Sequence, residues 1–438
     1  MKVGQKRRWK MFVVAGATMA LVTGMVSTVP SVYAGGMIKA DDDKYISIGM
    51  GIRQSFNMIE DAAPNGSTYS SDFSINNARI YINGGIHKYI KFAFNTECFG
   101  CAVGPNTGFA SNTNIGLLDA IGQFEFNELV NFWVGRTLVP TERGELNGPF
   151  YHAVFDGFRT PFNQADFSGN IGAGGAGLYG RDNGVVFFGK VHPGGTHLQY
   201  VASVFQGLRS GGTFCNVRPT DLLNDPTLTL YSGPCGPNQR SQVKYAGRLT
   251  WNLLNDESNP GYYTSGTYYG TAGDILAIAV GGEYQNAGAG SFANPSPWQH
   301  IVTDVLFEKV LPGNMGVFTA NGEFKRMWGQ NLAAFSDGTG CFCMFTGSSW
   351  TMYALYLFPN EIGIGKFQPY GRYTGLNSQF SGAREEYELG MNYVISGHNA
   401  RFSAFWRTGN SPGPFSPNWS ALSSKHIDSF NVALQLQY

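Results

Sequence analysis

Apolar and polar residues alternate along most of this chain. In the last nine residues, from Phe430 to Tyr438, every second position carries a large apolar side chain, and small or amide side chains stand between them. The same period of two occurs at residues 45–53, 91–97 and 400–407. Successive side chains of a β-strand point to opposite faces, so the pattern predicts strands with one apolar and one polar face. Apolar faces this complete favour a barrel with lipid outside and water inside over a soluble sandwich.

Sixteen such strands can be placed along the chain. They begin near residues 44, 73, 89, 115, 130, 181, 196, 242, 272, 300, 315, 348, 365, 384, 399 and 427. The links between them alternate between long and short. The long links cover about residues 57–72, 99–114, 138–180, 208–241, 287–299, 329–347, 378–383 and 408–426. Short turns at one end, long loops at the other and an even number of strands are typical of outer-membrane barrels.

One link breaks this alternation. Residues 255–271 lie on the side of the short turns, yet they form a long stretch that is rich in tyrosine and glycine. After Val32 the chain has no run of about 18 apolar residues, so no transmembrane helix is predicted there. The predicted fold class is therefore all-β, a 16-stranded antiparallel transmembrane β-barrel with short periplasmic turns and long outer loops.

Composition narrows the class of protein further. Charged residues make up 14% of the 438 residues, against roughly a quarter in ordinary soluble domains. Aromatic residues also reach 14%, which argues against a disordered chain, and the lack of long apolar runs argues against a helical membrane protein. The 30 basic and 30 acidic residues cancel, which gives no reason to expect a nucleic-acid partner.

The N-terminus has the layout of an export signal. Basic residues between Lys2 and Lys10 precede a mostly apolar stretch at residues 11–26, and the small side chains of Val32 and Ala34 stand where a signal peptidase requires them. We therefore expect residues 1–34 to be a secretory signal peptide and residues 35–438 to be the barrel domain. The alternative is an uncleaved membrane anchor, but the stretch is short and interrupted by glycine. Since the leader carries bases and no acids, the mature chain is modestly acidic.

Several motifs, taken in order, resemble those of a known family. They are NARIYIN at 77–83, YIKFAFNTE at 89–97, LLDA at 117–120, VGR at 134–136, VP at 139–140, RDNGV at 181–185, GYYTSGTYYG at 261–270 and DVLFEK at 304–309. On these motifs the mature chain is similar to the phosphate-selective porin O/P type of outer-membrane porin. The resemblance implies a barrel that is commonly a homotrimer, with its third loop folded inward as a constriction. It also implies anion selectivity that rests on arginines and lysines facing the channel.

The charges expected to line the channel do not show such an anion bias. They are the bases Arg53, Arg79, Lys91, Lys244, Arg248, Arg384, Arg401 and Arg407 and the acids Glu97, Asp119, Glu125, Glu283, Asp304, Glu308, Glu386 and Glu388. The constriction loop, residues 138–180, adds Arg143 and Arg159 against Glu142, Glu145, Asp156 and Asp166. A phosphate site needs clustered, desolvated cations, which this loop lacks. The sequence favours a weakly selective pore, and any one of these charges could instead belong to a pair that keeps the bore wet and rigid.

All six cysteines fall at or within predicted outer loops. They are Cys98, Cys101, Cys215, Cys235, Cys341 and Cys343. An even number in an exported protein predicts disulfides. Cys215 with Cys235 is the easiest pair and Cys98 with Cys101 is feasible, whereas Cys341 with Cys343 would close a strained small ring. Cross-pairing between the second and sixth loops stays open, and metal binding is weaker because no histidine stands at ligand spacing beside either close pair.

No motif of an enzyme or cofactor site stands in a suitable context. Glycines at 172–177 match G-x-G-x-x-G, but they lie in the third long loop without a βαβ unit around them. The sequence has no hydrolase elbow, no Walker A loop and no H-E-x-x-H. We therefore expect neither catalysis nor a cofactor or metal.

Three functions remain compatible with the sequence. The first is a passive porin through which small hydrophilic solutes or ions diffuse. The second is an anion- or phosphate-selective or sugar-biased channel, and the third is a structural sheath or receptor barrel that houses a partner protein. Each would lie in the bacterial outer membrane, in contact with its lipid and lipopolysaccharide.

Overall fold

The structure is a computed structural model that describes residues 36–99, 101, 114–157, 180–207, 242–290, 295–329, 346–379, 382–410 and 425–438. The predicted leader, residues 1–34, lies outside these residues. Nearly all of the described chain is in strands or in the links between them. No helix in this part is both long enough and apolar enough to cross a membrane.

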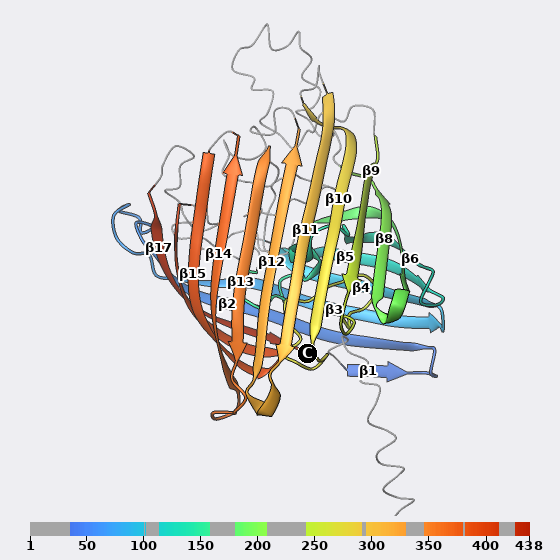
Figure 1. Cartoon of the computed structure of the whole chain (residues 1–438), viewed down its shortest axis with the longest axis horizontal. Helices are drawn as coiled ribbons and strands as arrows, with labels where there is room; N and C mark the ends of the chain where they lie inside the picture. Colours follow the sequence, from blue (N-terminus) through green and yellow to red (C-terminus); the bar gives the residue numbers. More distant parts are fainter. Residues whose placement is uncertain are drawn as a thin grey trace, which may run out of the picture. The chain divides into compact units, whose positions relative to one another are not determined.

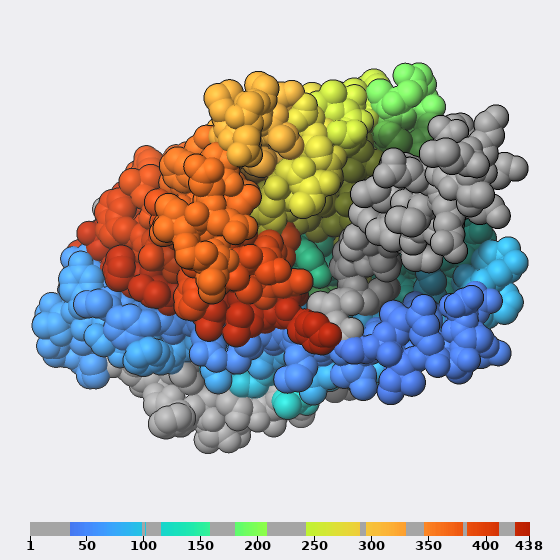
Figure 2. Space-filling view, turned by 90° about the horizontal axis from the view of Figure 1, so that it is seen from below, coloured from blue at the N-terminus to red at the C-terminus, as the bar shows by residue number. Residues whose placement is uncertain are grey.

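Sixteen strands form one closed antiparallel barrel (Figure 1). They are β2 (Tyr45–Ile59), β3 (Asp72–His87), β4 (Ile90–Phe99), β5 (Asn114–Glu125), β6 (Asn131–Leu138), β7 (Arg181–Val191), β8 (His197–Phe205), β9 (Lys244–Asn252), β10 (Ile275–Gly290), β11 (Pro295–Val310), β12 (Val317–Trp328), β13 (Gly347–Leu357), β14 (Lys366–Ser378), β15 (Gly382–Ser396), β16 (Ala400–Gly409) and β17 (Ile427–Gln437). Each strand pairs with the next, and β17 pairs with β2, so the sheet has no free edge between them. In Figure 2 the red C-terminal strands lie against the blue N-terminal strands at this seam. The predicted fold class is confirmed, and every predicted strand start lies within five residues of an observed one.

The alternation in sequence becomes the two faces of the wall. In β17, Phe430, Val432 and Leu436 are each more than 40% exposed on the outside, whereas Asn431 and Gln435 are buried on the inside. The same arrangement holds along β2, where Ile48 and Met50 face outward. An apolar outer belt around a polar interior is the arrangement that a lipid bilayer selects.

Two details differ from the sequence-based expectation. A short strand, β1 (Gly36–Lys39), pairs with residues 45–48 of β2, just beyond the point where β17 and Tyr438 end along that strand. Its four residues are too few for the alternation to reveal it. The fifth long link is also shorter than predicted, because β10 extends to Gly290 and β11 begins at Pro295.

Most links on the side of the chain's C-terminus are short turns, and outward-facing tyrosines support several of them. The hydroxyl groups of Tyr200, Tyr356 and Tyr393 each donate a hydrogen bond to a turn carbonyl, at Leu129, Met315 and Ile362 respectively. Tyrosines at this height combine an apolar ring for lipid with a polar tip for the interface. The exception is the long link of residues 253–274 between β9 and β10, which lies on the inside of the barrel.

Candidate functional site

Loop 3 leaves the wall after β6 and returns to it at β7, and its described residues are 139–157 and 180. It contains one short helix, α2 (Arg143–Leu146). Val139, Leu146 and Phe150 are each 1% exposed, so this loop packs within the barrel instead of standing on its rim. The third loop therefore folds inward, as the resemblance implies.

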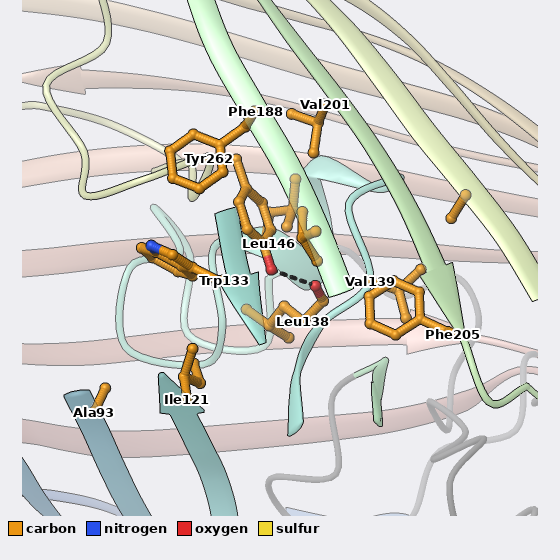
Figure 3. Packing of buried hydrophobic residues seen from close by; sticks show 12 residues of the cluster. Ala93, Ile121, Trp133, Leu138, Val139, Leu146, Phe188, Val201, Phe205 and Tyr262 are labelled. Carbon is orange, nitrogen blue, oxygen red and sulfur yellow. Dashed lines mark hydrogen bonds between the residues drawn. The ribbon is translucent and has the colours of Figure 1, made fainter. Parts of the chain in front are cut away.

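An apolar cluster inside the barrel holds the root of loop 3. Val139 and Leu146 of the loop belong to it, together with Trp133 of β6 and Tyr262 of the 253–274 segment (Figure 3). The ring centroids of Trp133 and Tyr262 are 5.2 Å apart, and the Tyr262 hydroxyl donates to the carbonyl of Leu138 at 2.7 Å. Gly261 precedes this tyrosine at a φ of 59°, where a Cβ would meet the Trp133 ring at 2.4 Å, so only glycine fits there.

Arg143 joins three elements at the helix of loop 3. Its Nε donates to Asp304 of β11 at 2.8 Å, and its two terminal nitrogens donate to the Glu257 carboxylate at 2.7 and 2.9 Å. One of these nitrogens also reaches the carbonyl of Ser265 at 3.2 Å. Arg248 of β9 binds Asp304 from the other side at 2.6 Å. Arg143 is fully buried, so it ties loop 3, the wall and the 253–274 segment together away from water.

A second group of ion pairs flanks this junction. Glu142 pairs with Lys325 of β12, and its other oxygen lies 3.2 Å from Nε2 of His300. Lys325 also lies 3.2 Å from Glu323, which accepts the main-chain N–H of Gly144 at 3.0 Å. Because these groups are all buried, each charge depends on its partners for solvation.

The far part of loop 3 is held by a different kind of contact. Arg401 of β16 donates to the main-chain carbonyls of His152 and Ala153, both at 2.9 Å, and Arg372 of β14 donates to that of Gly157 at 2.7 Å. Arg53 of β2 donates to the carbonyl of Phe155, and its guanidinium lies 4.0 Å above the Phe155 ring. Here arginine side chains replace the main-chain hydrogen bonds that an irregular loop lacks.

The buried charges of the wall divide into two sides. On β9–β12, which we call the acidic side, acids exceed bases: Glu283, Asp304, Glu308 and Glu323 stand with Lys244, Arg248 and Lys325. On β14–β16 and β2–β3, which we call the arginine side, bases exceed acids: Arg53, Arg79, Arg372, Arg384, Arg401 and Arg407 stand with Glu386 and Glu388. Together the two sides hold nine bases and six acids. The buried charges of β4–β7, which are Glu97, Asp119, Arg181 and Asp182, bring the totals to ten and nine, so the wall as a whole is nearly balanced.

Burial shifts the pKa of an acid in loop 3 upward on the acidic side, and it shifts the pKa values of two histidines, one in loop 3 and one in a short turn, downward on the arginine side. Burial raises the pKa of Glu145, at the acidic side, to about 7, and nearby Glu283 adds to the effect. Burial, with Arg53 and Arg401 beside it, holds the pKa of His152 well below its ordinary value. His398, in the turn before β16, has its pKa lowered to about 3 by burial and by Arg401. Both histidines are therefore neutral at physiological pH.

Most of the predicted lining residues lie on the inner face and are paired. Arg79 pairs with Glu97, Asp119 with Arg181 at 2.5 Å, Lys244 with Glu283 at 2.8 Å, and Arg407 with Glu388 at 3.1 Å. Arg384 is buried and reaches the carbonyl of Asn410 at 3.4 Å. Glu308 is buried and accepts hydrogen bonds from the 253–274 segment. Arg159 and Asp166 lie outside the described residues.

Two ion pairs formed by predicted lining and loop residues keep contact with water. The Lys91–Glu125 pair spans 2.7 Å near the short-turn end of β4 and β5, with side chains 32% and 26% exposed. Arg407 of β16 pairs with Asp156 of loop 3, with side chains 13% and 26% exposed. The Lys190–Asp256 pair, with side chains 24% and 29% exposed, also keeps contact with water, and a passing ion could approach each of these three pairs.

The sequence reasoning missed several inner charges. They are Arg181, Asp182, Glu257, Glu323, Lys325 and Arg372. Glu323, Lys325 and Arg372 stand at every-second positions of β12 and β14, in phase with the polar face, so a stricter use of the alternation would have found them. Glu257 lies in a link, where no periodicity exists to indicate its direction.

Among the described residues, neither the cysteines nor a group of metal ligands forms part of the site inside the barrel. Cys98 and Cys101 form a disulfide at the outer end of β4, with their Cα atoms 5.7 Å apart. The other four cysteines lie outside the described residues. In the described ranges, no group of three or more His, Cys, Asp or Glu side chains could hold a metal ion.

Known structures share this architecture at low sequence identity. OprB of Pseudomonas putida matches with 8% identity over 90% of this chain and 94% of that chain, at a TM-score of 0.52. OmpF of Salmonella typhi matches with 10% identity over 92% and 100%, and an anion-selective porin from Comamonas acidovorans with 12% identity over 90% and 100%, each at a TM-score of 0.50. No family model and no curated protein sequence matches the chain.

These likenesses concern the fold alone. The chain forms a 16-stranded closed barrel like those of bacterial outer-membrane porins. A closed barrel with an apolar outer belt satisfies every wall hydrogen bond inside a bilayer, and in bacteria such barrels lie in the outer membrane. That is the location of this protein.

Proposed function

We propose that the protein is a passive porin through which small hydrophilic solutes or ions diffuse, with weak selectivity and no chemical transformation. The observation that carries this proposal is the arrangement of charge inside the barrel. An acidic side and an arginine side are joined by an inward loop, and the charges of the whole wall and of this loop together nearly cancel. Opposed charges across a narrow bore orient and hydrate ions of both signs without excluding either.

Anion preference is the second candidate, and one observation favours it. The polar partners of Arg401 are the carbonyls of His152 and Ala153, the Tyr269 hydroxyl and the Gln435 amide oxygen, all of them neutral. A guanidinium bound to neutral oxygens keeps its full charge and attracts anions. Phosphate specificity of the porin O/P type is supported less, because Arg79, Arg372 and Arg407 are paired with carboxylates.

We also propose a homotrimer, on the resemblance to the porin O/P type alone. Analytical ultracentrifugation of the detergent-purified protein tests it, with the detergent mass matched by solvent density. A monomeric mass would refute the trimer without bearing on conduction.

Conductance measurements test the proposed function. The purified protein is inserted into planar bilayers, and reversal potentials are recorded in a KCl gradient, then with the chloride replaced by phosphate or the potassium by a large cation. We expect stable open channels with a small reversal potential and no block by phosphate. A large anion preference with phosphate block would favour the second candidate, and a folded protein that never conducts would favour the sheath.

A further inference from the structure

The 253–274 segment is much longer than the other described links at its end of the barrel. The other described links at its end of the barrel are residues 88–89, 126–130, 192–196, 311–316, 358–365 and 397–399. Joining two neighbouring antiparallel strands needs only a few residues. This long link is also deeply buried, since Tyr262 and Thr267 are fully buried and Ser265 is 2% exposed. A polar, tyrosine-rich link inside the barrel requires specific partners for its main chain.

Glu308 of β11 supplies those partners at the tip of the segment. Its carboxylate accepts hydrogen bonds from the main-chain N–H groups of Tyr268 and Gly270 at 3.0 and 2.8 Å, and from the Thr267 hydroxyl at 2.6 Å. Thr319 of β12 donates to the same carboxylate at 3.0 Å. A buried carboxylate bound by four donors on two elements holds the tip in one position.

The tip also meets loop 3 in the interior. The N–H of Gly266 donates to the carbonyl of Tyr151 at 2.8 Å, and the Thr264 hydroxyl donates to the Asn147 side chain at 2.7 Å. A Cβ at Gly266 would lie 2.6 Å from the main-chain nitrogen of Ala153, so the two segments approach as closely as glycine allows. Loop 3 enters from the long-loop end and the 253–274 segment from the short-turn end, and they meet within the bore.

We propose that the 253–274 segment is a second, fixed constriction of the pore, that Glu308 is the residue that positions it, and that it limits the size of the solutes that pass. This inference rests on the proposed function. Loop 3 and the segment occupy the bore together, so withdrawing either one widens the narrowest section. Glu308 acts through the segment and does not itself contact the solute.

The test compares single-channel conductance and liposome swelling with sugars of increasing size. Glu308→Ala removes the four acceptor contacts, and Gly266→Ala forces the segment away from loop 3 without altering charge. Gly322→Ala on β12 is the matched control, because a Cβ there meets no atom closer than 3.7 Å. We expect both test variants to raise conductance on the order of twofold, since ion flow follows the narrowest area. We also expect them to admit larger sugars, and the control to match the wild type.

The outcomes separate this inference from the proposed function. A wild type that does not conduct would overturn both. A conducting wild type whose Glu308→Ala and Gly266→Ala variants keep its conductance and its size limit would overturn the second constriction alone. If Glu308→Ala fails to form the heat-modifiable folded band on a gel, Gly266→Ala carries the test, because it leaves every buried charge in place.

Discussion

The two parts of loop 3 are attached by different chemistry. Near α2, Arg143 meets the carboxylates of Asp304 and Glu257, and Glu142 meets Lys325. Near Ala153, arginines donate mainly to main-chain carbonyls, although Asp156 forms a partly exposed ion pair with Arg407. An ion pair neutralises both partners, whereas a guanidinium bound to a carbonyl keeps its charge. Arginines thus produce an electroneutral attachment at one end of the loop and an electropositive wall at the other.

The two kinds of attachment should also differ in how a substitution affects the stability of the barrel and its ion selectivity. A buried ion pair that loses one partner leaves the other charge without solvent, so the first attachment is strong but costly to break. A carbonyl that loses its arginine is left as an unsatisfied but neutral group. We therefore expect substitutions on the acidic side to act mainly on folding, and substitutions on the arginine side to act more evenly on folding and ion flow.

The largest expected effect comes from Arg143→Met. It leaves the carboxylates of Glu257 and Asp304 buried, with Asp304 retaining only Arg248, and removal of one partner of a buried pair costs about 3–5 kcal/mol. Urea unfolding of the protein in lipid vesicles measures this loss in the free energy of unfolding. Lys190→Met is the matched control, because Lys190 pairs with Asp256 of the same segment at 2.5 Å but is 24% exposed. The control should lose less than about 1 kcal/mol, and equal losses in the two variants would mean that burial does not set the strength of these ion pairs.

A smaller loss of stability is expected from Arg401→Met on the other side. The carbonyl of Ala153 keeps the amide of Asn392 as a donor at 2.9 Å, so only part of the contact is lost. Hydrogen bonds from charged donors contribute about 1.5–3 kcal/mol, and the same unfolding assay should give a value in that range. The variant should also shift the reversal potential toward cations, because it removes a positive charge from the wall of the bore. A loss as large as that of Arg143→Met would mean that carbonyl contacts hold the loop as firmly as ion pairs do.

Glu145 of loop 3 and His398 of the turn before β16 should make the stability respond to pH in opposite directions. The pKa of Glu145 is raised from 4.5 to about 7, so its contribution to stability is complete below pH 4.5 and is lost as the pH rises through 7. The pKa of His398 is lowered from 6.5 to about 3, so its contribution is complete above pH 6.5 and is lost as the pH falls toward 3. Unfolding midpoints between pH 4 and pH 9 measure both, and we expect changes of about 1–2 kcal/mol, since one pKa unit corresponds to about 1.4 kcal/mol and relaxation reduces the shift.

Two variants assign these pH effects to their residues. Glu145→Gln should flatten the alkaline limb of the stability profile and leave the acid limb unchanged. His398→Gln should do the reverse, because its side chain stays neutral while it can still reach the carbonyl of Thr267, which His398 contacts at 2.9 Å. Profiles that keep the wild-type shape in both variants would place the titrating groups elsewhere.

Prediction from sequence succeeded where periodicity applies and failed where the chain leaves the wall. The inward position of Gln435, for example, follows from the period of two in β17. The partners of Arg143 do not follow from any local pattern, because Glu257 and Asp304 lie in distant parts of the chain and one of them is in a link. Residues 255–271 stood out as an anomalous turn, but their burial depends on Glu308, a contact that only the folded barrel creates.

The smallest effect on stability, and the most direct test of the bore, is expected at the partly exposed Lys91–Glu125 pair. Lys91→Gln leaves Glu125 uncompensated in water, so the reversal potential in a KCl gradient should shift toward cation selectivity, and Glu125→Gln should shift it toward anions by a similar amount. The double variant should lie near the wild type, and stability should change by less than about 1 kcal/mol in each. Shifts should shrink at high salt, because exposed charges are screened.

Lys88→Gln, which removes an exposed base from the adjacent turn, controls for a general surface effect. If neither single variant changes the reversal potential while the channel still conducts, ions do not pass close to this pair, and the pair does not contribute to the selectivity of the channel.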